Sequence, residues 1–193
     1  MYKKPAALAL LVAAACVGTG AQAKDVTGWF VNGGGGSAHY HATFEGLTGH
    51  ESDTAFNING GWRSQFIGVE AGYVDLGRVS EHDDLGDSAR VSGKGWTVGF
   101  NGHFNPTDKW YISARAGLFL WTLHGTATLA DGEGGLIGGS LSQHGTNGYG
   151  GIGTGVDINR HFSVGVDFDY YQSKKHGFDV GTRVYSVNVE YRF

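Results

Sequence analysis

The chain has 193 residues, of which 35 are glycine and only 2 are proline, and its formal net charge is −4. Together with a 13% share of aromatic residues, this composition favours strands and turns over helices, because glycine disfavours helices and aromatic side chains favour strands. The acidic balance argues against nucleic-acid binding, which depends on a surplus of positive charge.

The first 23 residues predict a cleaved export signal. Lys3 and Lys4 provide a positive start, residues 6–17 are apolar and uncharged, and Ala21-Gln22-Ala23 places small residues where a signal peptidase reads. The apolar run is shorter than the roughly 20 residues that a membrane-spanning helix needs. We therefore expect residues 1–23 to be removed and residues 24–193 to form one domain.

Cys16 raises an alternative, because a lipoprotein signal also ends its apolar stretch at a cysteine. The residue three positions earlier is Ala13, where such signals usually carry leucine or another large aliphatic residue. Cleavage after Ala23 fits better. It would leave a mature chain without cysteine, which excludes disulfides, thiol catalysis and cysteine metal sites.

Apolar residues recur at every second position over most of the mature chain. Alternate side chains of a strand point to opposite faces, so each such segment has one apolar face and one polar or small face. The last segment shows this most clearly, with polar residues between Tyr185, Val187, Val189, Tyr191 and Phe193. The pattern predicts eight strands, at residues 27–41, 53–62, 66–78, 92–104, 110–124, 147–158, 162–171 and 182–193.

A soluble sandwich would show the same alternation, but three features favour a membrane barrel. The segments run about ten residues or more, as tilted membrane strands do. Short connections near 63–65, 105–109 and 159–161 alternate with longer polar loops at 42–52, 79–91, 125–146 and 172–181, as in barrels with tight periplasmic turns. Aromatic residues gather at segment ends, as interfacial girdles require: Trp29, Tyr73, Trp96, Phe104, Trp110, Trp121, Phe162, Tyr170 and Tyr191.

These features predict an all-β protein, an eight-stranded antiparallel up-and-down transmembrane β-barrel. We expect it in the outer membrane of a Gram-negative bacterium, exported by the N-terminal signal, with both ends of the barrel on the periplasmic side. A closed barrel suits this environment because it leaves no backbone group unpaired in lipid.

Several segments resemble the transmembrane domain of the outer membrane protein A family. Gly60-Gly61-Trp62, residues 67–73 and Leu76-Gly77-Arg78 are similar to that family's second and third strands. Residues 105–108, Arg115-Ala116-Gly117 and Trp121 are similar to its hairpin between the fourth and fifth strands. The ending Tyr185, Val187, Val189, Tyr191 and Phe193 resembles the signal that the barrel-assembly machinery reads.

The sequence differs from that family in two respects. Well-known members of that family continue into a peptidoglycan-binding domain, whereas this chain stops at Phe193, so we expect no tether to the cell wall. Glu70 and Arg115 match interior positions of the family's ion gate, but the seventh strand offers Asp167 and Asp169 instead of a basic residue. A gate of that design is not expected here.

The alternation assigns a polar cluster to the barrel interior: Glu70, Arg115, Asp157, Asp167, Asp169, Glu190 and Arg192. An eight-stranded barrel is only wide enough for its own side chains, so these charges are expected to pair with one another, and we predict one direct pair between Glu70 and Arg115. The alternative is a narrow, cation-preferring pore, since five acids would face two arginines.

Histidines are frequent near the predicted loops, and His39 and His41 share a strand face. That spacing could grip a metal ion, but no third ligand is evident nearby. The segment His144-Gly145-Thr146-Asn147 is similar to the His-x-Ser-Asn segment of outer-membrane lipid A deacylases, but it lacks the serine. We therefore expect no catalytic residues, no metal and no cofactor.

The functional prediction is a non-enzymatic outer-membrane barrel with a structural, envelope-integrity or surface-interaction role through its outer loops. A pore is the first alternative, and a lipid A-modifying enzyme is the second. The expected partners are outer-membrane lipid and lipopolysaccharide, the barrel-assembly machinery and an unidentified extracellular ligand.

Overall fold

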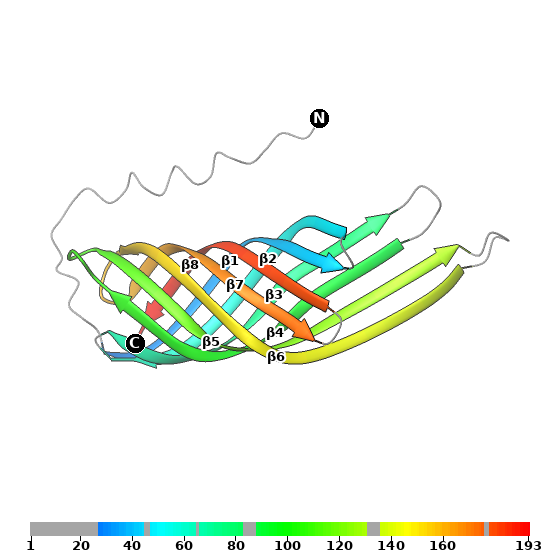
Figure 1. Cartoon of the computed structure of the whole chain (residues 1–193). Helices are drawn as coiled ribbons and strands as arrows, with labels where there is room; N and C mark the ends of the chain where they lie inside the picture. The colour runs from blue at the N-terminus through cyan, green and yellow to red at the C-terminus, as the bar shows by residue number, and fades with distance from the viewer. Residues whose placement is uncertain (1–26, 45–46, 65, 83–87, 131–135, 176–177) are drawn as a thin grey trace, which may run out of the picture.

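The computed structural model describes residues 27–44, 47–64, 66–82, 88–130, 136–175 and 178–193. These residues form one closed barrel in which each strand pairs antiparallel with the next and the last pairs with the first (Figure 1). The strands are β1 Gly28–Phe44, β2 Leu47–Arg63, β3 Ile67–His82, β4 Ser88–Phe104, β5 Trp110–Ala130, β6 Leu136–Asp157, β7 Phe162–Lys175 and β8 Phe178–Arg192. The predicted fold class is confirmed. Within the described ranges, no helix has the length and apolar character needed to cross a membrane.

The predicted membrane-facing positions form a continuous apolar belt on the outside of the barrel. Val98, Leu118, Val166 and Val187 are each more than half exposed, although all four lie in the middle of their strands. Aromatic residues border this belt, with Trp29, Trp96 and Phe104 also more than half exposed. In water such a surface would be costly, but in hydrocarbon it is the expected exterior of a membrane barrel.

Trp121 is a correction to the predicted aromatic girdle. Its side chain is only 1% exposed and points into the barrel, because Trp121 has the same parity on β5 as Arg115. The physical reason is that the lumen near the upper border of the belt is filled with apolar side chains, so an aromatic residue at this height does not have to meet an interface.

The strands are longer than predicted, and most of the predicted loops are strand. β5 continues from the predicted end at residue 124 to Ala130, and β6 begins at Leu136 instead of residue 147. Their hairpin is hydrogen-bonded up to the pair Ala130 and Leu136 and reaches beyond the β7–β8 hairpin at that end of the barrel (Figure 1). The sequence shows no hydrophobic alternation there, so the pattern did not identify these residues as strand.

The barrel therefore has two unlike ends. At the short-turn end lie the connections that follow β2, β4 and β6, together with the C-terminus. At the long-hairpin end the strands project to different heights (Figure 1). On β3 a register shift between Asp75 and Arg78 coincides with Gly77, whose φ of +89° suits a glycine because other residues rarely adopt it.

The seam between β1 and β8 closes the barrel, pairing Phe30 with Arg192 and, higher up, Gly36 with Ser186. β1 contributes four consecutive glycines, residues 33–36, to the middle of this seam. A Cβ atom on Gly36 would lie 1.8 Å from the carbonyl oxygen of Tyr185. No side chain fits at that point, so the glycine run gives the strands room to meet.

The orientation of β8 predicts how a charge on the belt affects folding. Val189 is 48% exposed in the middle of the apolar stretch of β8, so Val189→Arg should destabilise the folded barrel in lipid vesicles by about 2–4 kcal/mol. Thr54→Arg is the matched control, since Thr54 is exposed on β2 above Phe56, and it should cost far less. Equal urea midpoints for Val189→Arg and wild type would show that this face of β8 does not meet lipid.

Candidate functional site in the barrel interior

The interior is layered, and its lowest layer is a buried ionic network at the short-turn end. Arg192 of β8 contacts the carboxylate of Asp157 and donates from its Nε to Glu190 Oε1 at 2.9 Å. Glu190 also accepts from Arg63 Nη2 at 2.6 Å. All four residues are at most 6% exposed, so each charge depends on its partners, because an unpaired charge is costly away from water.

Polar neighbours complete the hydrogen bonding of Asp157. Asn105 Nδ2 donates to Asp157 Oδ2 at 2.6 Å, and the hydroxyl of Ser163 donates to Asp157 Oδ1. His103 Nε2 lies 3.5 Å from Asp157 Oδ2, and the imidazole stacks on Tyr111 with ring centroids 4.3 Å apart. Asp157 thus joins four elements, β4, β6, β7 and β8, at the base of the barrel.

The middle layer is centred on Arg115 of β5. Its guanidinium donates from Nε to Asp169 Oδ1 at 2.7 Å and from Nη2 to Asp169 Oδ2 at 2.6 Å, a bidentate pair, and from Nη2 to Asp167 Oδ2 at 2.8 Å. Both aspartates belong to β7, so the arginine reaches across β6. The reach is possible because Gly151 lies between Arg115 and Asp169 in the register, where a Cβ atom would lie 1.9 Å from Asp169 Oδ1.

Glu70 lies in the same layer but has a different partner. Its Oε1 accepts from the hydroxyl of Tyr149 at 2.8 Å. The predicted direct pair between Glu70 and Arg115 is wrong, since among the described residues the ion pairs of Arg115 go to Asp167 and Asp169. Both β3 and β7 are two strands from β5, but Asp169 lies in the same row as Arg115, across Gly151. The row of Glu70 crosses β5 at Gly117 and leads to Tyr149, so the arginine fork meets the two aspartates.

An internal cavity of about 30 Å³ lies between these two layers. Its lining includes Arg63 and Glu190 from the lower network and Arg115 and Asp167 from the middle layer. A space of this size holds roughly one or two water molecules. The polar half of the interior is therefore almost filled by its own side chains.

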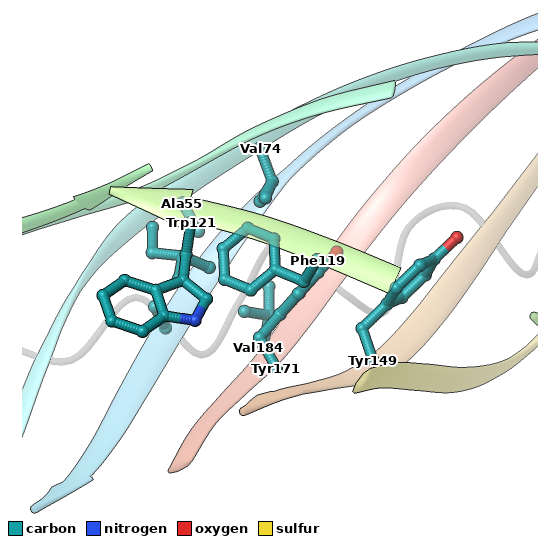
Figure 2. Packing of buried hydrophobic residues seen from close by; sticks show 9 residues of the cluster. Ala55, Val74, Phe119, Trp121, Tyr149, Tyr171 and Val184 are labelled. Atoms are coloured by element: carbon teal, nitrogen blue, oxygen red, sulfur yellow. The ribbon is translucent and has the colours of Figure 1, made fainter. Parts of the chain in front are cut away.

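Above the polar layers the lumen is closed by an apolar plug (Figure 2). Tyr149 and Tyr171 stack with ring centroids 5.7 Å apart, and Phe119 meets Tyr171 edge to face at 5.0 Å. The indole N–H of Trp121 donates to Asn147 Oδ1 at 2.7 Å, so its one polar atom is satisfied inside the plug. The plug residues are Ala38, Ala55, Val74, Leu76, Phe119, Trp121, Tyr149, Tyr171 and Val184.

All seven residues that the alternation assigned to the interior lie inside the barrel. Six of them are at most 9% exposed as whole residues, and the side chain of Arg115 is 10% exposed. They fall into two groups: Asp157, Glu190 and Arg192 at the base, and Glu70, Arg115, Asp167 and Asp169 in the middle.

Sequence reasoning missed two charged or titratable members and the plug. Arg63 was assigned to a turn, yet it has the same parity on β2 as the inward Asn59. His103 likewise shares the face of Asn101 on β4. Strict parity would have found both residues, whereas the plug breaks the rule that the inner face is polar or small.

Arg63 changes the charge balance inside the described barrel. Five acids face three arginines, instead of the two arginines expected from sequence, and every arginine is paired with an acid. The excess of negative charge that would favour a cation path is therefore smaller than predicted.

The other candidate motifs do not assemble into a site within the described part of the chain. Among those residues no group of three or more His, Cys, Asp or Glu side chains is placed to hold a metal ion. His39 lies on the outside, edge-on to Tyr185 with ring centroids 5.7 Å apart, and the side chain of His41 lies outside the described residues. Asn147, from the deacylase-like segment, is bound by Trp121 and by the backbone N–H of Lys174.

The middle layer predicts a specific pattern of energetic coupling. Arg115→Met should lower the free energy of unfolding by about 3–5 kcal/mol, because it leaves two buried acids without their cation. In double-mutant cycles, Arg115→Met should couple strongly to Asp169→Asn, by about 2 kcal/mol or more, and more weakly to Glu70→Gln. Urea unfolding in lipid vesicles measures both cycles. A larger coupling to Glu70 than to Asp169 would contradict the observed pairing.

Comparisons with known proteins agree with this architecture. The family model of the outer membrane protein beta-barrel domain matches residues 7–193. No curated protein sequence matches the chain.

Solved structures share the fold at low sequence identity. One is Ail, the attachment invasion locus protein of Yersinia pestis, in complex with the heparin analogue sucrose octasulfate, with 18% identity, a TM-score of 0.55 and coverage of 86% of this chain and 99% of that one. Neisserial surface protein A has 16% identity, a TM-score of 0.57 and coverage of 86% and 98%. OprG of Pseudomonas aeruginosa has 15% identity, a TM-score of 0.55 and coverage of 86% and 96%. With its eight-stranded barrel and a family match over nearly the whole length, the chain belongs to the outer membrane protein β-barrel domain family.

Proposed function

We propose that this protein is a non-enzymatic integral outer-membrane barrel that presents an extended β-sheet outside the cell for adhesion or recognition. In this orientation the short-turn end faces the periplasm and the long hairpins project from the outer surface. One observation carries the proposal: the strands continue as a sheet beyond the height at which the barrel is closed.

Backbone pairing between neighbouring strands stops at two places toward the long-hairpin end. β2 pairs with β3 only up to Phe56 and Asp75, and β6 pairs with β7 only up to Tyr149 and Tyr171. Beyond these points β3, β4, β5 and β6 continue as one sheet, while β7, β8, β1 and β2 continue as another. Each of these sheets therefore has two lateral strand edges, and at the gap between β2 and β3 Asp53 still accepts the backbone N–H of Arg78.

Among the described strands, the edge of β6 is the one without a charged residue. Its upper part, residues 136–142, pairs with β5 on one side, and the described pairing of β6 with β7 begins only at Tyr149 and Tyr171. This stretch spans about 23 Å at about 3.3 Å per residue. It contains no proline and no Asp, Glu, Lys or Arg.

Natural sheets usually protect their exposed edges with lysine, proline or a bulge. An unprotected, uncharged edge is the type of surface to which an extended segment of another protein adds as a further strand. The unprotected edge therefore supports a role in binding at the cell surface. The proposed interaction surface is therefore a hydrogen-bonded sheet, whereas the sequence suggested the outer loops.

The filled interior argues against the alternative of a cation-preferring pore. A permeating ion would have to pass the ion pairs of Arg115 and the aromatic plug around Phe119 and Trp121, whose side chains are 0% and 1% exposed. The lipid A-modifying alternative gains no support either, since Asn147 of its candidate segment has a structural role in holding Trp121.

We also propose that the outward residues of β8 form the signal for barrel assembly. Tyr185, Val187, Val189 and Phe193 are exposed on the belt face, and Tyr191 contacts the rings of Phe162 and Phe193. The aromatic end of this row lies at the short-turn end, which faces the periplasm in the proposed orientation. An assembly factor approaching from the periplasm would meet these residues first.

Shortening the β5–β6 hairpin should abolish the surface interaction without affecting the barrel. Gly125 and Leu141 are direct cross-strand partners, so residues 126–140 can be replaced by Asn-Gly, which forms a two-residue hairpin turn. In a deletion strain, this variant should reach the outer membrane at wild-type levels but should not restore attachment to host cells or to an abiotic surface.

The matched control keeps the hairpin length and replaces the same residues by an alternating Ser-Thr and Lys-Thr hairpin with a charged edge. Loss of attachment in both variants, with normal levels and normal heat-modifiable mobility, would identify the β6 edge as the surface. Full attachment by the shortened variant would overturn the proposal.

Conductance separates the proposed role from the pore alternative. The purified wild-type barrel should give no single-channel steps in planar bilayers, because its lumen is filled. The double variant Phe119→Ala and Trp121→Ala removes the largest plug residues, while Leu118→Ala and Leu120→Ala removes outward side chains from the same strand. Steady cation-selective steps from wild type would establish the pore, and steps from the plug variant alone would show that the plug is the barrier.

A further inference from the structure

A group of cations lies on the outer face of the barrel directly above the apolar belt. Trp96 of β4 and Tyr73 of β3 are cross-strand partners, and their rings meet at 5.2 Å. Trp96 is 62% exposed, so this pair marks the upper border of the belt on that side. The next outward residue of β4 is Lys94, followed by Ser92 and Arg90.

Arg78 joins this group because of the irregularity in β3. The outward residues of β3 below it have odd numbers, from Ile67 to Asp75, so a regular strand would point residue 78 into the barrel. The register shift between Asp75 and Arg78 instead sets Arg78 opposite Ser92, on the outer face, where it is exposed. Bulges commonly re-aim a side chain in this way, and Gly77 supplies the required conformation with its φ of +89°.

The register fixes the spacing of the three cations. Lys94 and Arg90 are four residues apart on one strand, about 13 Å at about 3.3 Å per residue. Arg78 lies on the adjacent strand at the height midway between them, about 5 Å to one side. On the other side, β5 places the hydroxyl residues Thr122 and Thr126 opposite Lys94 and Arg90.

Two acids flank these cations in the part of the chain that the structure describes. Asp53 Oδ2 accepts the backbone N–H of Arg78. Asp75, opposite Lys94, accepts the backbone N–H of Gly77 with its Oδ1 at 2.9 Å. None of the three cationic groups has a described carboxylate within ion-pair distance, whereas Lys174 on β7 pairs with Asp179 at 3.0 Å. The cations therefore outnumber the neighbouring acids at the height where lipid headgroups begin, and their donor groups are directed to no described acid.

We propose that Arg78, Arg90 and Lys94 form a binding site for the phosphate groups of a phosphorylated glycolipid in the outer leaflet, the lipid A part of lipopolysaccharide. Arginine suits phosphate because its planar fork donates two parallel hydrogen bonds, and lysine adds a compact charge. The acyl chains would lie against the belt below Trp96, and the threonine hydroxyls would face the sugar. The site goes beyond the proposed surface role and does not involve the β6 edge.

The test compares two variants that lose the same charge. The site variant carries Arg78→Gln, Arg90→Gln and Lys94→Gln. The control carries Lys109→Gln and Arg160→Gln at the short-turn end and Lys174→Gln, whose charge is already paired. Each protein is refolded into detergent micelles, its heat-modifiable mobility is checked, and binding of deep-rough lipopolysaccharide and of its enzymatically dephosphorylated form is titrated.

We expect the site variant to lose affinity for lipopolysaccharide by about tenfold or more, since several charge-assisted contacts disappear. The control should change by less than about twofold, and wild type should bind the dephosphorylated form as weakly as the site variant binds the native one. Deletion of Gly77 removes the extra residue of β3 and keeps Arg78 opposite Ser92 on the outer face, so this variant should bind lipopolysaccharide as wild type does.

Unchanged affinity in the site variant, or an equal loss in site variant and control, would overturn the proposal. The hairpin replacement at residues 126–140 removes Thr126 but leaves all three cations in place, so the loss of surface attachment and the loss of phosphate binding are measured with different variants.

Discussion

A backbone that crosses hydrocarbon has no water to bond with, and the rest of this structure depends on that constraint. Each peptide group must find its partner in a neighbouring strand, so the sheet has to close on itself. Closure with eight strands leaves a lumen too narrow for anything except side chains. The inner face therefore has to be packed as tightly as a protein core, although its sequence is largely polar and rich in glycine.

Glycine rows in the wall solve this packing problem. Tyr149 of β6 reaches Glu70 of β3 by lying flat across Gly117 and Gly99, which are successive partners in the register. A Cβ atom on Gly117 would come within 2.8 Å of the tyrosine ring. The same principle lets Arg115 cross β6 at Gly151. The high glycine content thus serves to seat long side chains along the direction of the strand hydrogen bonds.

Much of the fold follows from parity in the sequence. Alternation predicts eight strands and assigns each residue of the membrane band to lipid or lumen, because a strand with one face in lipid tolerates few exceptions. Beyond the lipid, a strand no longer needs an apolar face. The β5–β6 extension, with residues such as Gly138, Gly139 and Ser140, has no alternation, and only the structure identifies it as strand.

The contents of the lumen are less predictable for a different reason. Parity tells which side chains enter but not which of them meet, since partners such as Arg115 and Asp169 lie on strands that are not neighbours. The choice between Asp169 and Glu70 depends on which intervening positions lack a side chain. Trp121 shows the complementary limit, because an aromatic residue at a strand end fits an interface and a plug equally well.

The seam between the first and last strands has a consequence for the order of folding. It joins residues separated by most of the chain, such as Phe30 and Arg192, and such distant pairings are slow to form. In the middle of the seam the glycines at 33–36 bury almost no side-chain surface, so an early contact between β1 and β8 is only weakly stabilised. β1 therefore has to wait as an open edge until β8 is in place, and the final step is a zippering driven by backbone hydrogen bonds. The barrel therefore closes last at the β1–β8 seam, where the glycines bury the least side-chain surface.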